Sequence, residues 1–364
     1  MMKDDIAHNK KNPTPGVIIN HPQGPNVYKG VPKDYSGELV TSKNFLDILQ
    51  GKKVKGGSGK VITSGPHDHI FINFAGHGAP GFLVFPKDLL FATEFNKVIK
   101  KIHTDKKFAN MVIYIEACQS GSMFEDHLPD NVNVYATTAA NSAEFTWACY
   151  LDEKRHTYLG DCYSVNWMED ADKADLHKET VIEQYEVVKN GTSMSHVQQF
   201  GDSSVGELTL KNFLGYKKLE AIRYATVPQN PVLSRDVPVT IFLKQMEMTR
   251  DGATKKYLAK KLQELIRDRN FVVEKVTNIT SFVSTGNTEN ATLLLSDHRQ
   301  LRNVSCYEQV VRHFNEYCFS LSLNAYVLSY AHVLVNMCES GYDFDSVSRA
   351  MDLACTHPPV VGIV

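Results

Sequence analysis

Two features are missing from this sequence of 364 residues, and each excludes a class of protein. No stretch approaches the about 18 to 20 consecutive apolar residues that a membrane-spanning helix requires, so we expect a soluble chain without a membrane span. The charge is nearly balanced, with 39 basic and 41 acidic residues, which leaves no basic excess for binding nucleic acid. No internal repeat is visible. The length predicts two domains at the usual size of about 150 residues each.

The N-terminal residues MMKDDIAHNKKNPTPG lack the apolar segment and the cleavage site of a secretory signal. The cysteines, in contrast, indicate a protein of the secretory route, because four of the seven lie in one C-terminal segment: Cys306, Cys318, Cys338 and Cys355. Such a cluster is typical of disulfides formed in an oxidising compartment, and four cysteines allow three pairings. Four glycosylation sequons favour the same compartment: Asn190, Asn278, Asn290 and Asn303. We therefore expect the start of this chain to be incomplete.

The pattern of apolar residues changes once along the chain. Residues 68–74, 111–117 and 132–138 are short runs rich in Val, Ile, Tyr and Phe, separated by helix-length spacers, and this predicts a parallel sheet with crossover helices. Residues 224–239 contain three prolines and no helical period, so they are predicted to be a linker or an extended segment. After about residue 250 the period is helical, as in 257–266, 309–321 and 326–337, which predicts a second, all-helical domain.

A histidine and a cysteine follow two of the predicted strands. His77 comes shortly after the first strand, and Cys118 comes directly after the second. Functional groups gather at the carboxyl ends of parallel strands, so we expect these side chains at the same edge of the sheet. A thiol needs a neighbouring base to become a nucleophile, and imidazole is the usual one. The pattern predicts a His77–Cys118 dyad, with a buried core cysteine and a plain loop histidine as the alternatives.

Two glycines flank His77. Gly76 and Gly78 carry no side chain that would prevent a sharp turn or a close approach to a substrate. The backbone N–H groups of Gly78 and Cys118 are candidates for binding the oxyanion of a tetrahedral intermediate. The small polar turn 119-QSGS-122 suits an open site. Together these residues predict an acyl-transfer site.

Several longer stretches resemble one known family. They are 76-GHGAPGFLVFP-86, 113-IYIEACQSGSMF-124, 134-VYATTAANSAE-144, 157-TYLGDCYSVNWMED-170 and 193-SMSHVQQFGD-202. They are similar, in this order, to the legumain family of asparaginyl endopeptidases, which belongs to the caspase-like clan of cysteine peptidases. The stretches 306-CYEQVVRHFNEYCF-319 and 334-LVNMCES-340 resemble the C-terminal prodomain of that family. The resemblance extends over nearly the whole chain.

The resemblance implies an α/β fold in which a caspase-like parallel-sheet catalytic domain is followed by an all-helical, death-domain-like prodomain. The implied division is a peptidase domain over residues 1–235, a linker or activation peptide over 236–255 and a prodomain over 256–364. In the family, the prodomain covers the active site until acidic pH weakens its contacts and the linker is cut. The resemblance also implies the disulfides Cys306–Cys338 and Cys318–Cys355. Spacing alone leaves open a helical module that only stabilises or binds.

The resemblance also implies the roles of single residues. Its His-Gly motif places the catalytic histidine at His77, and its Glu-Ala-Cys motif places the nucleophile at Cys118. Glu116, Thr146 and Asp161 match positions at the pocket for the asparagine, where an acid accepts from the side-chain amide. From the residues alone, Asp161 is equally compatible with a solvated loop acid, and Glu116 needs a partner because it lies inside a strand.

Four departures from the family distinguish this chain. Gly76 stands where the family has an aspartate before the catalytic histidine, so the pH behaviour of the dyad and any ligase activity are expected to differ. Phe145 and Thr146 replace a common pair of serines and make the pocket wall bulkier. Gln119 replaces the usual acid after the nucleophile. Residues 246–255 contain no asparagine, so self-cleavage at asparagine is not expected there.

The family also has a first central strand and a following loop, and the sequence begins after both. That loop supplies an asparagine to the catalytic group, and an arginine and a histidine to the substrate pocket. Without the strand, we expect one edge of the sheet to lack a neighbour. Without the arginine, nothing would balance the charges of Glu116 and Asp161.

The resemblance implies a cysteine endopeptidase that cleaves after asparagine, and less readily after aspartate at acidic pH. It would be made as a zymogen for lysosomal protein processing, in the lysosome, in endosomes or outside the cell, with peptide substrates and cystatin-type inhibitors as partners. No cofactor and no metal are expected. The alternative is a catalytically impaired relative that acts as a binding or regulatory module. Kinship with the glycosylphosphatidylinositol transamidase subunit is disfavoured, because the C-terminal region is cysteine-rich and no membrane anchor follows it.

Overall fold

The computed structural model describes residues 1, 9, 12–215 and 227–364. Most of the N-terminal segment and the first residues of the predicted linker, 224–226, lie outside the described residues. The chain divides into two compact units. The first contains Met1–Gly78 and Phe82–Ser234, and the second contains Ala79–Gly81 and Arg235–Val364.

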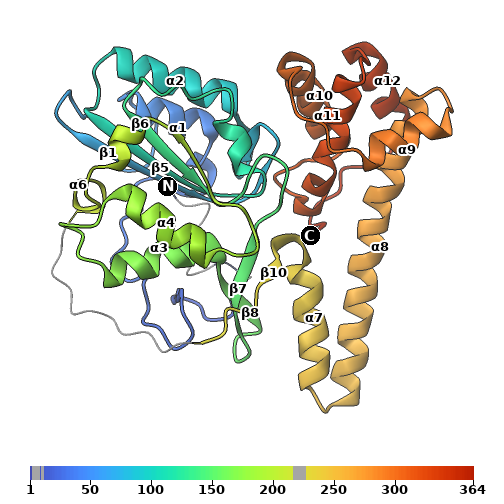
Figure 1. Ribbon diagram of the computed structural model, residues 1–364. Helices are drawn as coiled ribbons and strands as arrows, with labels where there is room; N and C mark the ends of the chain where they lie inside the picture. The colour runs from blue at the N-terminus through green and yellow to red at the C-terminus, as the bar shows by residue number, and fades with distance from the viewer. Residues whose placement is uncertain (2–8, 10–11, 216–226) are drawn as a thin grey trace. The chain divides into compact units, whose positions relative to one another are not determined.

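A four-stranded sheet in the order β1-β5-β6-β9 forms the centre of the first unit (Figure 1). Its strands are β1 (His69–Ala75), β5 (Asn110–Glu116), β6 (Val134–Thr138) and β9 (Gln198–Gly201). The first three are parallel, and β9 runs antiparallel to β6. The parallel sheet predicted from the apolar runs is therefore confirmed. Strand β9 was not predicted, because its sequence QQFG lacks the β-branched residues typical of a strand.

Helices cover both faces of this sheet, so the first unit has three layers. Helices α1 (Ser42–Leu49) and α2 (Ala92–Thr104) pack on one face, and α3 (Cys162–Lys173) and α4 (Val181–Gly191) pack on the other. The first core includes Ile70, Phe95, Ile99, Met111 and Ile113, and the second includes Tyr114, Tyr135, Tyr163, Val181 and Tyr185. Because β5 lies under helices on both faces, its sequence is continuously apolar up to Glu116.

Strand β1 is at the edge of the sheet. Among the described strands, β5 is its one neighbour, as expected from the sequence. Asn73 and Ala75 are exposed, whereas Ile70 and Ile72 point into the core below α2. The alternation of buried and exposed residues along β1 follows from this position.

Two small sheets and several short helices accompany the central sheet. One sheet contains β2 (Gly78–Ala79), β3 (Phe82–Val84) and β4 (Leu89–Phe91), and the other contains β7 (Trp147–Asp152), β8 (Thr157–Asp161) and β10 (Val232–Leu233). The short helices are η2 (Gly37–Leu39), η3 (Ser120–Met123), α5 (Ser203–Gly206) and α6 (Lys211–Leu214). Helix η4 (Ser234–Asp236) spans the boundary between the two units along the chain.

The second unit is helical, as predicted. It contains α7 (Val237–Met248), α8 (Gly252–Val283), α9 (Thr288–Ser296), α10 (Val304–Tyr317), η5 (Ala325–Tyr330), α11 (Ala331–Glu339) and α12 (Phe344–Ala354). Several of these helices start at a polar side chain that accepts from the first turn, as Asp251 does from the N–H groups of Ala253 and Thr254.

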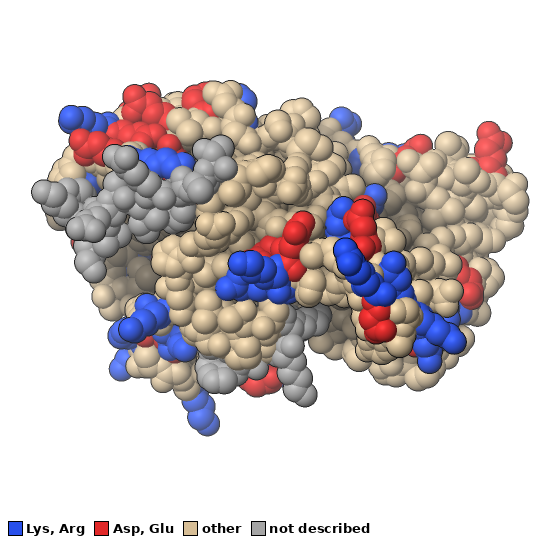
Figure 2. All heavy atoms as spheres, turned by 90° about the horizontal axis from the view of Figure 1, so that it is seen from below, with Lys and Arg blue, Asp and Glu red and all other residues tan. Residues whose placement is uncertain are grey.

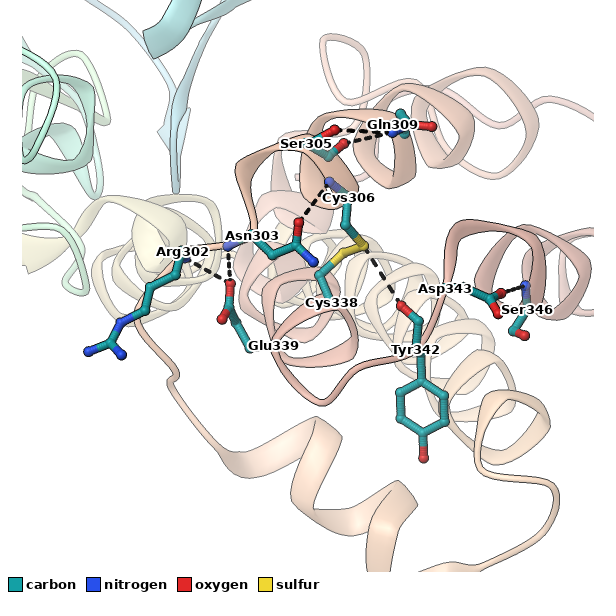
Figure 3. The surroundings of a disulfide bond; sticks show 10 residues. All are labelled: Arg302, Asn303, Ser305, Cys306, Gln309, Cys338, Glu339, Tyr342, Asp343 and Ser346. Atoms are coloured by element: carbon teal, nitrogen blue, oxygen red, sulfur yellow. Dashed lines mark hydrogen bonds between the residues drawn. A yellow bond between two sulfur atoms is a disulfide. The ribbon is translucent and has the colours of Figure 1, made fainter.

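Two disulfides join helices of the second unit. Cys306 is bonded to Cys338, and Cys318 is bonded to Cys355, which are the two pairings that the resemblance implied. Around the first bond, the Glu339 carboxylate accepts from the backbone N–H groups of Arg302 and Asn303, at 2.7 and 2.6 Å (Figure 3). The Cys306–Cys338 bond and the Glu339 contacts together fix the start of α10 against the end of α11.

The prediction for residues 224–239 is wrong at its C-terminal end. Helix α7 begins at Val237, inside the segment that was predicted to be extended. Pro238 lies in the first turn of this helix, where the missing N–H has no partner to lose and the fixed φ suits the helix. Residues 249–251 are the non-helical break between α7 and α8.

Among the described residues, no helix combines the length and the apolar character needed to span a bilayer. Helix α8 is long, with 32 residues, but it carries many charged side chains. Figure 2 shows acidic and basic side chains close to one another on the face that it draws. This mixture agrees with the near-zero net charge of the chain, −2.

Candidate active site

Strands β1 and β5 bring the two predicted catalytic residues to the same edge of the sheet. Ala75 pairs with Glu116 at the end of the parallel ladder, and the N–H of Gly76 donates to the Glu116 carbonyl at 3.0 Å. His77 lies two residues after Ala75, and Cys118 lies two residues after Glu116. The His77 side chain is exposed, and its carbonyl accepts from the N–H of Val84 at 2.9 Å, which anchors the loop.

Gly78 touches the backbone of the nucleophile. A Cβ atom at Gly78 would lie 2.7 Å from the carbonyl oxygen of Cys118 and 3.0 Å from the Cβ atom of Ala117. Neither Gly76 nor Gly78 has a positive φ, so neither glycine is needed for an unusual backbone conformation. Gly78 is needed because there is no room for a side chain between the histidine loop and Cys118.

The Cys118 thiol is partly exposed and contacts Thr146. The Thr146 N–H donates to Sγ at 3.4 Å, and the Thr146 hydroxyl lies 3.5 Å from the same atom. Burial raises the pKa of Cys118, the two contacts with Thr146 lower it, and the charges of Glu116 and Asp161 raise it. The net pKa is above the usual value, so a thiolate requires a base or cation beside the sulfur.

The chain turns sharply directly after the nucleophile. Gln119 has a φ of 53°, in the left-handed region, which costs a residue with a side chain about 1 to 2 kcal/mol. Its N–H donates to the carbonyl of Glu144 at 2.8 Å, and the N–H of Gly121 donates to the carbonyl of Ala140 at 3.0 Å. The Gln119 side chain is buried, and its Oε1 has no hydrogen-bond partner among the described residues. Strain of this kind is typical of functional sites.

Buried Glu116 and half-buried Asp161 form an acidic pair beside Cys118. The Glu116 Oε2 atom accepts from the N–H of Ser164 in the first turn of α3 at 2.9 Å, whereas Oε1 has no partner among the described residues. Burial raises the pKa of Glu116 well above its usual value, and the neighbouring charge of Asp161 raises it further. Burial also raises the pKa of Asp161, to about 6. The structure therefore disagrees with a solvated loop position for Asp161.

Thr146 connects the nucleophile to this acidic pair. Its hydroxyl lies 3.3 Å from the Ser234 hydroxyl, which in turn donates to Asp161 at 3.4 Å. Spacing could not predict Ser234 as a member of this cluster, because it is 88 residues from Thr146. The structure thus brings together all five predicted site residues of this region: Gly78, Glu116, Cys118, Thr146 and Asp161.

The four glycosylation candidates differ in exposure. Asn190, Asn290 and Asn303 are exposed, and Asn303 also caps α10 by accepting from the N–H of Cys306. Asn278 is half-buried near the C-terminal end of α8, and Thr280 of its sequon is fully buried. The exposed positions are therefore the better candidates for a surface glycan. Among the described residues, no group of three acidic, cysteine or histidine side chains is arranged to hold a metal ion.

Comparison with known proteins shows the family of the chain. Residues 1–216 match the sequence model of the Peptidase C13 family, and residues 260–355 match that of the legumain prodomain. The chain belongs to the peptidase C13 family. It is 47% identical to mouse legumain and 45% identical to human legumain, over 98% of this chain and 83% of each relative. It is 39% identical to rice vacuolar-processing enzyme beta-isozyme 1, over 97% of this chain and 76% of that protein. The family is one of cysteine endopeptidases, and Cys118 is a free cysteine two residues after the end of β5 in the central sheet.

Proposed function

We propose that this C13 peptidase cleaves peptide bonds after asparagine, and after aspartate only at acidic pH. The acidic pair beside Cys118 is the observation that supports this specificity most directly. An asparagine side chain can donate both amide protons, and Glu116 Oε1 is a buried acceptor without a partner among the described residues. A substrate residue without such a donor would leave this oxygen unpaired, at a cost of about 1 to 3 kcal/mol.

In the proposed reaction, Cys118 Sγ attacks the backbone carbonyl carbon of the substrate asparagine while His77 accepts the thiol proton. The N–H groups of Gly78 and Cys118 bind the oxyanion, and His77 gives its proton to the amine as the C–N bond breaks. Water then attacks the resulting thioester, with His77 again taking the proton, and releases the carboxylic acid and the Cys118 thiol. Because the pKa of Cys118 is raised, the thiol depends on proton transfer to His77 to become a nucleophile.

The pKa of Asp161, about 6, explains the proposed pH dependence for aspartate. Below this pH Asp161 is protonated, and the raised pKa of Glu116 favours its neutral form, so a negatively charged substrate aspartate meets acids that can donate to it. Above it Asp161 is ionised and repels the substrate carboxylate. An asparagine side chain is neutral, so it is affected far less.

The second unit supports a zymogen. Residues 260–355 match the legumain prodomain, and the non-helical, exposed residues 250–251 between α7 and α8 are the part of the 236–255 linker that a peptidase could reach without unwinding a helix. The two disulfides agree with maturation in an oxidising compartment, followed by work in an acidic one such as a lysosome. Glycans at the exposed sequons and inhibition by cystatin-type proteins belong to the same proposal.

The competing function is an impaired relative that binds peptides without cleaving them. The raised pKa of Cys118 favours this alternative, because it lowers the fraction of thiolate. A fluorogenic peptide with asparagine before the scissile bond, at about pH 5.5 and so below the pKa of about 6 of Asp161, distinguishes the two. We expect the wild-type protein to hydrolyse it and Cys118→Ala to be inactive. Cys149→Ala, which removes a buried thiol in another cluster, is the matched control and should retain activity. Equal rates for wild type and Cys118→Ala would disprove the peptidase mechanism.

A further inference from the structure

One loop holds the turn that carries the nucleophile. At its start, the Ala140 carbonyl accepts from the N–H of Gly121, and near its end the Glu144 carbonyl accepts from the N–H of Gln119. Thr146, two residues further on, makes both contacts with the Cys118 sulfur. The position of Sγ therefore depends on where residues 140–146 lie.

The Glu144 side chain fastens this loop. Its Oε1 accepts from the N–H of Asn141 at 2.8 Å and from the N–H of His196 at 2.7 Å, and its Oε2 lies 2.8 Å from Nδ1 of the His196 ring. Three hydrogen bonds to one carboxylate close the loop on itself and bind it to the segment before β9. The Glu144 side chain is 23% exposed, so these bonds are partly shielded from water.

The same segment also holds the other end of the loop. The hydroxyl of Ser195, which is buried, donates to the carbonyl of Ala139 at 2.7 Å. Ser195 and His196 are consecutive residues, and they contact the loop on either side of its tip. The loop is thus fixed at two points by one stretch of chain.

An isolated ion pair with an exposed partner contributes little, and the His196 side chain is 78% exposed. Glu144 differs from such an isolated pair because its side chain and its backbone carbonyl both make contacts. Its carboxylate binds His196, and its own carbonyl receives the N–H of Gln119, the residue after the nucleophile. A change in the side-chain contacts is passed to Gln119 through a single residue.

We propose that Glu144 and His196 are a positioning pair, which keeps residues 140–146 in place so that Thr146 and the Glu144 carbonyl hold Cys118 for attack. This inference deepens the proposed peptidase function. Neither side chain touches the substrate in the proposed reaction. In agreement, the hydrogen bond that the His196 ring donates to the Glu144 carboxylate raises the pKa of His196, so that at acidic pH the imidazolium strengthens the contact.

The test compares Glu144→Ala, Glu144→Gln and His196→Ala in the full chain. For hydrolysis of the asparagine peptide, we expect kcat to fall about tenfold in Glu144→Ala while KM changes less than about twofold, because a misplaced nucleophile affects the chemical step. Glu144→Gln keeps an acceptor oxygen for the two backbone N–H groups and should recover most of kcat. His196→Ala removes only the ring contact and should lie between them.

Glu183→Ala is the matched control. The Glu183 carboxylate also accepts from a backbone N–H and from a hydroxyl, but both belong to Thr180 at the start of α4 and not to the loop around Cys118. Thermal unfolding of all variants separates loss of position from loss of fold. If the wild-type protein is active and Glu144→Ala and Glu183→Ala have the same kcat, the positioning role is disproved.

A second measurement does not depend on peptidase activity. The rate of alkylation of Cys118 by iodoacetamide is measured at a series of pH values by peptide mass spectrometry. The midpoint of this pH profile gives the pKa of the thiol. In Glu144→Ala the loop is no longer held, so Thr146 should lose a hydrogen bond to the Cys118 thiolate. This loss should move the pH profile to higher pH by about one unit. If the wild-type protein fails to cleave the peptide but this shift is seen, the proposed function is wrong and the positioning pair is retained. An unchanged profile disproves the pair.

Discussion

Gly78 and Cys118 are in such close contact that a single methyl group would not fit between them. A Cβ atom on Gly78 would lie 2.7 Å from the Cys118 carbonyl oxygen, which is shorter than a van der Waals contact. The histidine loop and the nucleophile, which are 40 residues apart in the sequence, therefore form one rigid site.

Gly78→Ala tests this contact. Because the obstacle is backbone and not a flexible side chain, we expect the histidine loop to be displaced, with kcat/KM reduced about 100-fold and a loss of stability of about 1 to 3 kcal/mol. Gly76→Ala is the control, since its Cβ atom would meet only the ring of Phe74, at 3.1 Å. Peptide hydrolysis and thermal unfolding of both variants measure the difference. Similar kinetics for the two would show that the contact has no role in catalysis.

Thr146 should control the acidity of the nucleophile. Thr146→Val removes the hydroxyl near Cys118 Sγ but keeps the backbone N–H, so we expect the pKa of Cys118 to rise further. Alkylation of Cys118 should then require a pH higher by about one unit, as for the loss of one hydrogen bond to a charged group. Thr146→Ser restores the hydroxyl and should behave as wild type. A common profile for all three proteins would contradict the prediction.

The pKa of Asp161 predicts a change of specificity with pH. The ratio of kcat/KM for aspartate and asparagine peptides should increase as the pH falls through about 6, where Asp161 becomes protonated. The side chain of the substrate aspartate has a pKa of about 4, so it stays charged through most of this range. Asp161→Asn should remove the step near pH 6 and allow aspartate cleavage at neutral pH as well. A wild-type ratio that does not vary between acidic and neutral pH would exclude Asp161 from recognition.

A second acid pair predicts the pH dependence of stability. The pKa of Glu179 is raised to about 7 by burial and by Asp170, and the pKa of Asp170 is also raised. A carboxyl group whose pKa is raised on folding stabilises the protein when protonated, so its contribution is complete below the unfolded pKa and is lost as the pH rises through about 7.

We therefore expect the thermal midpoint to be higher at acidic than at neutral pH, with Glu179→Gln flattening the dependence. Glu264→Gln in α8 is the control, because the pKa of Glu264 is lowered by its bond to Lys261, so its effect has the opposite sign, and its charge is not among those that raise the pKa of Glu179. If wild type and Glu179→Gln show the same slope, the pair does not contribute.

The sequence predicted the regular part of this protein well. Local patterns predicted the three parallel strands, the change to a helical second unit, and the placement of His77 and Cys118 at strand ends. These features can be predicted because the period of apolar residues and the glycines are read from neighbouring positions along the chain. Helix α7 was missed where prolines suggested an extended linker, since a proline in the first turn of a helix is indistinguishable from one in a linker.

The contacts that define the site depend on tertiary structure. Ser234, Glu144 and His196 give no signal in the sequence, since each acts on Cys118, Thr146 or Asp161 only after residues far apart in the chain are brought together. The same is true of the raised pKa values of Glu116 and Asp161, which result from burial beside one another. The sequence by itself determined which reactive groups are present and at which strand ends they lie. Only the tertiary structure decided their protonation and their partners, because desolvation and hydrogen bonding depend on distances across the fold.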